Sequence, residues 1–311
     1  MKIVFMGTPD YAVKTLEALI GAGHTVAAVF AQPDKPVGRK QILTPPPVKV
    51  CAQMYGIPVF QPRTLRDGEA EKIIRNISPD VIAVVAYGKI LPTEILTLPR
   101  YGCVNGHASL LPKYRGAAPI QWCIVNGEKE TGVTAMQMDE GMDTGDILET
   151  AVTEIGAEET AGELFERLSV IGAKLLVKTL ADIENGNVTP IKQDESKATS
   201  APIIKKEMAK ISFHDMTAEE VHNAVRGFYP WPVAFFISGG KRIKIIKSRV
   251  VNMRGTAGAV LKSDNELIVA CKKEAVALET IQPEGSKPMT AKQYLCGRPI
   301  ALGTEIEDEN G

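Results

Sequence analysis

Three short, mainly apolar runs constrain the fold of this chain more than any other feature of its sequence. They are KIVFM at 2–6, VAAVF at 26–30 and VIAVV at 81–85. Strands that are apolar on both faces occur in parallel sheets that helices cover on both sides. Apolar residues at helical spacing, such as Leu16 and Leu19, follow the first run. The N-terminal part is therefore expected to be an α/β domain with a mostly parallel sheet.

The first expected helix has recognisable ends. Asp10 is expected to cap its N-terminus, because its carboxylate can accept the unpaired N–H groups of the first turn. Gly21 and Gly23 are expected to end it. The preceding turn occupies the place of a dinucleotide-binding loop, but it lacks the GxGxxG pattern. Pro9 and Asp10 stand where glycines would let a pyrophosphate approach, so binding of NAD is poorly supported.

Residues 32–49, QPDKPVGRKQILTPPPVK, connect two of the expected elements. This segment contains five prolines and four basic residues. Because proline lacks an N–H and fixes its own backbone, the segment is expected to lack regular structure. Long loops in compact domains are often functional. A solvated surface loop is the alternative.

The composition changes in the last third of the chain. Residues 185–202 contain glycine, prolines and the polar run QDESK, which is typical of a linker. The β-rich runs that follow are short and are separated by glycine and polar residues, which predicts a small all-β barrel or sandwich. They lie at 241–251, 258–262 and 266–271.

Charge is distributed unevenly between these two parts. Residues 203–311 hold 16 Lys and Arg against 13 Asp and Glu, although the whole chain has a net charge of −1. Four of those 13 acids lie in the final tail. A basic β domain beside a basic loop suits a partner with a phosphate backbone. A randomly charged surface remains the alternative.

The cysteine spacing and the hydropathy of the chain indicate its cellular location. The five cysteines are widely spaced and no two form a CxxC pair, so reduced cytosolic thiols are expected rather than disulfides or a zinc site. The N-terminus lacks the long apolar region of a signal peptide, and no stretch approaches about 18 apolar residues. The chain is therefore expected to be cytoplasmic, with no membrane span.

The central segment VNGHASLLPKYRGAAPI, at 104–120, contains the first candidate for catalysis. Asn105 and His107 are two residues apart, so in an extended strand both side chains point to the same side. Ligands of parallel sheets bind at the carboxyl ends of the strands. A histidine can accept or give a proton near pH 7, and an asparagine amide can donate to a developing oxyanion. On the residues alone, a structural hydrogen-bonding role for His107 is equally well supported.

Residues 136–146, MQMDEGMDTGD, concentrate carboxylates among glycines. The acids are Asp139, Glu140, Asp143 and Asp146. Their spacing does not fit a calcium-binding hand. One of them could instead orient His107 and stabilise its protonated form, and the residues alone do not decide which. Motifs for serine nucleophiles, phosphate loops and zinc helices are missing, and Cys103 and Cys123 are interpreted as small buried residues.

Taken together, these motifs resemble the folate-dependent formyltransferases. The resemblance rests on Asn105-Gly-His107 with SLLP at 109–112, and on Asp143, which matches the third catalytic position of that family. MGTPDYA at 6–12, QPDKPVGR at 32–39 and YPWP at 229–232 are similar to members that act on a charged tRNA. The resemblance extends from residue 1 to about residue 300. It implies a Rossmann-like catalytic domain at 1–185, a linker at 186–206 and an OB-like β-barrel that binds tRNA at 207–311.

The resemblance also implies substrates and site residues. The donor would be 10-formyltetrahydrofolate, the acceptor would be the amino group of methionyl initiator tRNA, and no metal would be needed. The folate would contact Lys89, Ile90, Leu91, Ser109, Leu110, Leu111, Pro112, Met138 and Asp139. The tRNA would contact the 34–49 loop and the barrel through Lys35, Arg39, Lys40, Lys49, Lys241, Arg242 and Lys244. A monomer is expected.

With this resemblance, the predicted mechanism is direct acyl transfer. The amine attacks the formyl carbon, Asn105 and protonated His107 hold the oxyanion, and Asp143 orients His107. Three alternatives remain. A sugar formyltransferase would need neither the basic loop nor the basic barrel, and a glycinamide ribonucleotide formyltransferase would have the catalytic domain alone. A non-catalytic RNA-binding protein would leave Asn105, His107 and Asp143 without a role.

Overall fold

A computed structural model describes residues 1–38 and 40–306. The chain forms two compact units, each assembled from separate stretches of sequence. The first comprises Met1–Pro119, Glu130–Glu154 and Phe165–Ala201, and the second comprises Ile120–Lys129, Ile155–Leu164 and the chain from Pro202 onward. The two units are described separately below.

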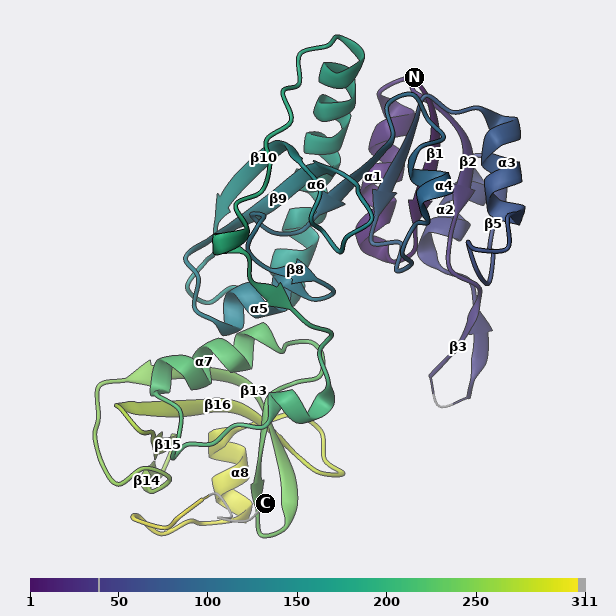
Figure 1. Cartoon of the computed structure of the whole chain (residues 1–311). Helices are drawn as coiled ribbons and strands as arrows, with labels where there is room; N and C mark the ends of the chain where they lie inside the picture. Colours follow the sequence, from purple (N-terminus) through teal and green to yellow (C-terminus); the bar gives the residue numbers. More distant parts are fainter. Residues whose placement is uncertain (39, 307–311) are drawn as a thin grey trace. The chain divides into compact units, whose positions relative to one another are not determined.

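The first unit is built on a seven-stranded sheet, counted over the described residues (Figure 1). Its strands, in spatial order, are β10 (Ile147–Glu154), β9 (Glu130–Gln137), β7 (Cys103–His107), β6 (Val81–Val85), β1 (Lys2–Gly7), β2 (Thr25–Phe30) and β5 (Val59–Phe60). The pairs from β5 to β7 are parallel, and β9 and β10 are antiparallel to their neighbours. The expected mostly parallel α/β sheet is confirmed.

The three apolar runs form the centre of this sheet. Every side chain from Val81 to Val85 is buried, as are those from Ile3 to Met6. Burying a side chain such as Ile82 stabilises the fold by about 1.5–3 kcal/mol. The helices of the first unit are α1 (Asp10–Gly21), α2 (Pro47–Met54), α3 (Glu69–Ile77), α4 (Thr93–Leu96) and most of α6 (Ala161–Glu184), whereas α5 (Pro119–Val125) lies almost entirely in the second unit.

The expected capping by Asp10 is wrong. Pro9 occupies the N-cap position of α1 and forms no side-chain cap, whereas Asp10 is already the first helical residue. Its carboxylate lies in the first turn, where a negative charge is favourable beside the helix dipole. Gly21 is the last residue of the helix, so the predicted end is confirmed.

The expectation that residues 32–49 lack regular structure is also wrong. Residues Lys35–Val37 (β3) pair with Ile42–Thr44 (β4) in an antiparallel hairpin, which projects from the first unit in Figure 1. Over the described residues this ribbon is two-stranded, so Pro36 can lie on it without removing a donor that a third strand would need. Pro47 then begins α2 at a position where its missing N–H costs nothing.

The second unit is organised around an antiparallel sheet. Its strands are β12 (Phe235–Ser238), β13 (Lys241–Val251), β16 (Ala275–Pro283), β15 (Leu267–Ala270) and β14 (Val260–Ser263), with β17 (Met289–Thr290) paired to β16. The helices α7 (Ala218–Gly227) and α8 (Ala291–Gly297) contact this sheet. The β-rich runs predicted from the sequence are confirmed, and the long β13 matches its predicted bounds.

Side-chain hydrogen bonds fix both ends of α7. Thr217 accepts from the N–H of Glu220 and the Glu220 carboxylate accepts in return, which forms a capping box. Arg226, in the last turn, is almost fully buried and donates to Asn223 and to the carbonyls of Gly156 and Glu159. Burial lowers the pKa of this guanidinium from its usual value. These bonds join the 155–160 segment to α7 within the second unit.

Two further expectations concern the burial of the cysteines and a membrane-spanning helix. Cys103 and Cys123 are buried, as predicted, and burial raises the pKa of Cys103 to about 12. A thiol with such a pKa is a poor nucleophile at neutral pH. Among the described helices, none combines the length and the hydropathy needed to cross a bilayer.

Candidate active site

Strand β7 brings Asn105 and His107 to the same side of the central sheet. It pairs in parallel with β6 through Asn105 and Val84, and antiparallel with β9 through His107 and Thr134. Both side chains are largely buried, with exposed fractions of 9% and 6%. Within the described residues no hydrogen bond engages the Asn105 side chain, so its amide is available to a ligand.

The two nitrogens of His107 face different groups. Nε2 lies 2.9 Å from the carbonyl oxygen of Tyr114, which can only accept, so Nε2 carries a proton. Nδ1 lies 3.6 Å from Oδ2 of Asp143. In the neutral ring, Nδ1 therefore presents a lone pair towards a carboxylate. A proton on Nδ1 would lie between this nitrogen and the Asp143 carboxylate, within ion-pair distance.

Asp143 is the carboxylate that the fold places beside His107. Its Oδ2 accepts from the N–H of Gly116 at 2.8 Å, and its own backbone adopts a left-handed conformation with φ of 55°. Aspartate tolerates this conformation better than most residues. Asp139, by contrast, accepts from Gly141 and Thr144 of its own loop.

The loop after β7 returns close to the strand end. Thr134 of β9 donates to the carbonyl of Ser109 and accepts from the N–H of Leu111, so the loop is fixed to the sheet. Residues Arg115–Gly116 (β8) pair with Ser200–Ala201 (β11). Gly116 has φ of 119°, and an added Cβ would lie 2.8 Å from the carbonyl oxygen of Ala201. Only glycine fits there, and its N–H is the group that holds Asp143.

Comparison with known proteins places this chain in a family. The model for "Formyl transferase" matches residues 1–180, and the model for "Formyl transferase, C-terminal domain" matches residues 203–299. Methionyl-tRNA formyltransferase from Alkaliphilus oremlandii is 49% identical, with 97% of this chain and 98% of that protein covered. The same-named protein from Thermodesulfovibrio yellowstonii is 46% identical, with 97% and 98% covered. The chain belongs to the methionyl-tRNA formyltransferase family.

A solved structure agrees with this family at the level of the fold. The N-formyltransferase from Helicobacter canadensis, in complex with folinic acid and dTDP-3-aminofucose, superposes with a TM-score of 0.69 at 23% identity. The match covers 91% of this chain and 99% of that one. The family membership also supports the fold expected from the sequence, a Rossmann-like formyltransferase domain followed by an OB-like domain.

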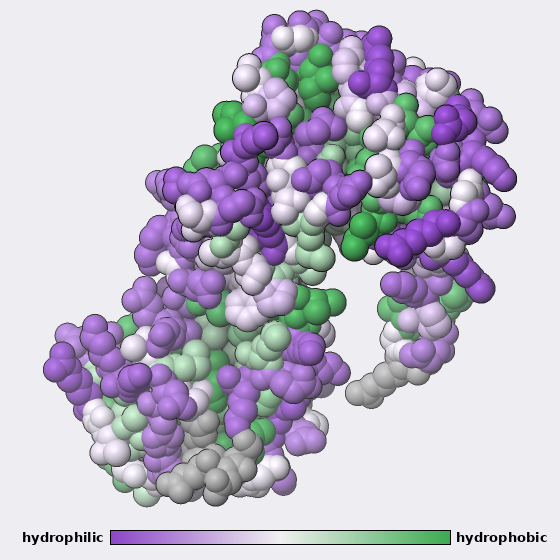
Figure 2. All heavy atoms as spheres, viewed as in Figure 1, coloured by the Kyte–Doolittle hydropathy of each residue, from purple (hydrophilic) through white to green (hydrophobic). Residues whose placement is uncertain are grey.

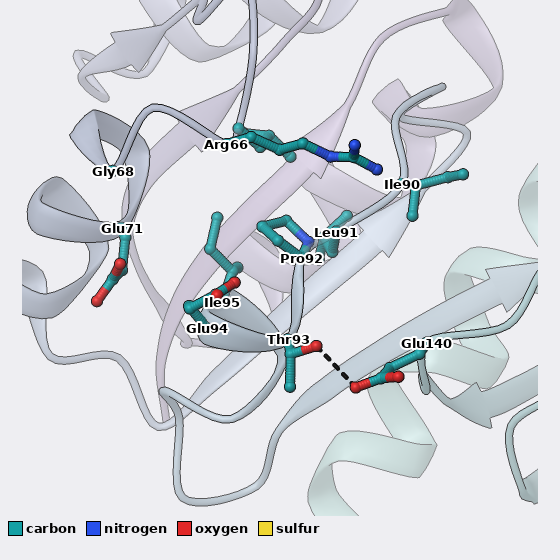
Figure 3. Close-up of a pocket in the computed structure, with 11 residues that line it drawn as sticks. Arg66, Gly68, Glu71, Ile90, Leu91, Pro92, Thr93, Glu94, Ile95 and Glu140 are labelled. Atoms are coloured by element: carbon teal, nitrogen blue, oxygen red, sulfur yellow. Dashed lines mark hydrogen bonds between the residues drawn. The ribbon is translucent and has the colours of Figure 1, made fainter.

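A cavity of about 480 Å³ lies in the first unit, between the start of α3, the segment that leads into α4 and the loop that follows β9 (Figure 3). Ile90 and Leu91, both expected to contact folate, line it. Thr93 at the start of α4 donates to Glu140 at 2.7 Å, which joins two walls of the cavity. The remaining lining residues are Leu65, Arg66, Gly68, Glu71, Pro92, Glu94 and Ile95.

Other residues expected to contact folate lie outside the lining of this cavity. Lys89 donates to the carbonyls of Pro62 and Arg63, and burial lowers the pKa of its ammonium group. Ser109 is fully buried and donates to the carbonyl of Lys113. Leu110, Leu111 and Pro112 continue the same loop, Met138 packs against the core, and Asp139 bonds within its own loop.

The residues expected to contact tRNA in the hairpin differ in their surroundings. Lys35 and Lys40 are exposed on the arm, whereas Arg39 lies outside the described residues. Lys49 lies at the base, with both oxygens of Asp34 and Oε1 of Gln61 within 2.9 Å. Figure 2 shows hydrophobic and hydrophilic residues side by side on this arm. The exposed apolar side chains on it are Val37, Ile42 and Leu43.

The lysine and arginine residues of β13 fall into two groups. Lys241, Arg242 and Lys244 have no acidic partner among the described residues. The Arg242 guanidinium lies 3.9 Å from the centre of the Phe235 ring, and this contact orients its plane. Farther along, Lys247 and Arg249 pair with Glu279. The three residues expected to bind tRNA are thus the unpaired ones.

Several residues at this site could not be anticipated from the sequence. Gly116 and Gln193 bond to the Asp143 loop from positions far away in the chain. The cavity wall from Leu65 to Glu71 belongs to a segment that carries no motif. The N–H of Gly116 and the amide of Gln193 become visible as partners only once β8 and β11 are paired.

Proposed function

We propose that this chain transfers a formyl group from 10-formyltetrahydrofolate to the amino group of methionyl initiator tRNA, as its family name describes. Family membership over nearly the full chain supports the reaction and both substrates. We further propose that it acts as a cytoplasmic monomer. The N-terminal domain would catalyse the transfer and the C-terminal domain would bind tRNA.

The single observation that carries the proposed mechanism is the arrangement of Asn105, His107 and Asp143 at the end of β7. The free amide of Asn105 would donate to the formyl oxygen as it becomes an oxyanion. His107 would take the proton of the attacking amine at Nδ1, which faces Asp143 at 3.6 Å. The Asp143 carboxylate would stabilise the imidazolium that forms.

The breakdown of the tetrahedral intermediate would use the same groups in reverse. His107 would return the proton to the folate nitrogen as its bond to the formyl carbon breaks. The carbonyl of Tyr114 would keep the ring in one orientation through both proton transfers, since it holds Nε2 at 2.9 Å. The role predicted for Asp143 alone would therefore be shared by Tyr114, which would fix the tautomer, and Asp143, which would balance the charge.

The cavity of the first unit has the character that a folate would need. Leu65, Leu91 and Ile95 supply apolar walls for a flat ring system, while Arg66 and Glu140 supply polar groups. Its volume lies within the range of about 300–1,000 Å³ that is typical of small-molecule sites. Asp143 and Glu140 lie on one loop, so donor binding and catalysis would share that loop.

The tRNA would contact the protein at two places. On the hairpin, the exposed Lys35 and Lys40 would contact phosphates, and we propose the same role for Arg39. On the barrel, Lys241, Arg242 and Lys244 would contact the tRNA backbone, since no described acidic residue pairs with them. Because Lys49 is bound to Asp34, we propose that it supports the hairpin more than it contacts phosphate directly.

Formyl transfer to charged initiator tRNA by the purified protein tests this function. Free amino sugars should be poor acceptors in the same assay. Replacement of Asn105, His107 or Asp143 by alanine should lower kcat by about 10²–10³, the usual cost of removing such a group. Asn187→Ala, at an exposed position, is the matched control. Normal turnover in all three variants would rule out the mechanism, and preference for an amino sugar would rule out the acceptor.

A further inference from the structure

Gln193 connects two loops that approach the candidate active site from different parts of the chain. Its Nε2 donates to the carbonyl oxygens of Asp143 and Gly145, at 2.8 and 2.7 Å. Its Oε1 accepts from Nε and Nη2 of Arg115, at 3.1 and 2.8 Å. Both ends of one amide are therefore used, and the side chain bridges β8 to the turn that carries Asp143.

The bridge continues outward to an ion pair. Arg115 donates to both oxygens of Glu195, at 2.9 and 2.7 Å. These bonds raise the pKa of the Arg115 guanidinium and lower the pKa of the Glu195 carboxyl. Arg115 is only 13% exposed, whereas Glu195 is 71% exposed. The partly buried guanidinium is thus fixed in plane and presents its remaining N–H groups to Gln193.

Asp143 is consequently held from two directions. Gln193 holds its backbone carbonyl, and the N–H of Gly116 holds its carboxylate at 2.8 Å. The residue has φ of 55°, a backbone conformation that persists only where neighbouring groups enforce it. The two carbonyls, at positions 143 and 145, flank the bend, so their shared donor fixes its shape.

We propose that Gln193 is a positioning residue, which sets the orientation of Asp143 towards His107 by holding the 143–145 turn. The proposal rests on the proposed function only for its kinetic readout. Neither substrate needs to touch Gln193, because its amide is fully engaged by protein groups. A shift of about 1 Å in a catalytic group can lower a rate roughly 100-fold, so a loss of this brace should be visible in kcat.

Gln193→Glu is the most discriminating substitution. The carboxylate keeps the shape of the side chain and its bond to Arg115, but it lacks both donors and repels the two carbonyls. We expect kcat to fall roughly 10–100-fold, with little change in KM for the tRNA. Lys192→Ala, at the exposed neighbouring position, is the matched control and should retain the wild-type kcat.

A double-mutant cycle with Asp143→Asn separates positioning from general stability. If Gln193 acts through Asp143, Gln193→Glu should cost much less in the Asp143→Asn background than in the wild type, because the two losses overlap. Full additivity, or a wild-type kcat for Gln193→Glu, would overturn the proposal. Gln193→Ala, which removes the brace without adding charge, should show the same overlap.

Hydrogen exchange provides a readout that does not depend on the acceptor. Amides of residues 139–146 should exchange faster in Gln193→Glu than in Lys192→Ala, while those of β6 and β7 should be unaffected. Unchanged exchange in the turn would refute the brace even if formylation were lost. If the wild type failed to formylate tRNA, the proposed function would fail, and exchange alone would decide the role of Gln193.

Discussion

Two glycines on neighbouring strands of the central sheet have different surroundings, and they give opposite predictions for stability. At Gly106 in β7, an added Cβ would meet only Cγ2 of Val85, at 3.6 Å. At Gly132 in β9, it would lie 2.1 Å from the carbonyl oxygen of Ala151 and 2.6 Å from a methyl group of Leu110. Both residues lie in strand interiors, so only the available space differs.

Gly106→Ala should raise the free energy of unfolding by about 0.5–1 kcal/mol, because alanine loses less backbone entropy on folding than glycine. Gly132→Ala should lower it by about 1–3 kcal/mol through overpacking. Denaturant unfolding of the two variants beside the wild type measures both changes. Equal effects at the two positions would contradict this interpretation of the contacts.

Single residues also show how far the sequence predicts the site. Alternation along one strand was enough to bring Asn105 and His107 together, because the side-chain period of a strand is two. The choice of Asp143 among four neighbouring acids had to come from a family resemblance. In the structure, Asp143 is held in place by the N–H of Gly116 and the amide of Gln193, which lie 27 and 50 residues away in the chain.

At the scale of elements, the hairpin shows where propensity misleads. Prolines at 33, 36, 45, 46 and 47 argue against a sheet, and the prediction of an irregular loop followed from that. Proline is excluded only where a neighbouring strand needs its N–H, and no other strand of the described chain pairs with β3 or β4. Asp34 precedes the hairpin and Lys49 follows it, and the two form an ion pair at its base. This ion pair could not be predicted from the sequence either.

This ion pair predicts a pH dependence of the hairpin. Hydrogen bonds from Lys49 and Gln61 hold the pKa of Asp34 below its usual value. A carboxyl group whose pKa is lower in the folded than in the unfolded state stabilises the fold at pH values above its unfolded pKa of about 3.9. This stabilisation is lost as the pH falls through the pKa of the folded state. Lys49→Met should therefore speed amide exchange of residues 35–44 at pH 7, and the effect should shrink as the pH falls below about 4.

The control for this prediction is Lys14→Met. Lys14 pairs with Glu17 on the surface of α1, where both side chains are about half exposed, so its loss should leave the hairpin unchanged. If Lys49→Met and Lys14→Met gave the same exchange in residues 35–44 at pH 7, Lys49 would have no role at the base of the hairpin. Its direct contact with tRNA would then become the better interpretation.

For the whole molecule, the sequence predicted the two classes of sheet for different reasons. The N-terminal sheet follows from strands that are apolar on both faces, since these must be covered by helices. The C-terminal sheet follows from short β-rich runs divided by turns. The sequence did not predict which stretches of the chain belong to each compact unit. The helix α5 and residues 155–164 belong with the C-terminal unit through contacts such as those of Arg226.

The division of charges along β13 leads to a prediction for tRNA binding. Each Lys or Arg that neutralises a phosphate releases counterions, so KM for the tRNA should rise with salt. Arg242→Gln or Lys244→Gln should raise KM and reduce the salt slope by about one each. Lys247→Gln is the matched control, because Lys247 already pairs with Glu279 at 3.2 Å. Steady-state kinetics over a range of salt concentrations would test this, and an equal effect of all three substitutions would show that the acidic partners do not select the phosphate-binding residues.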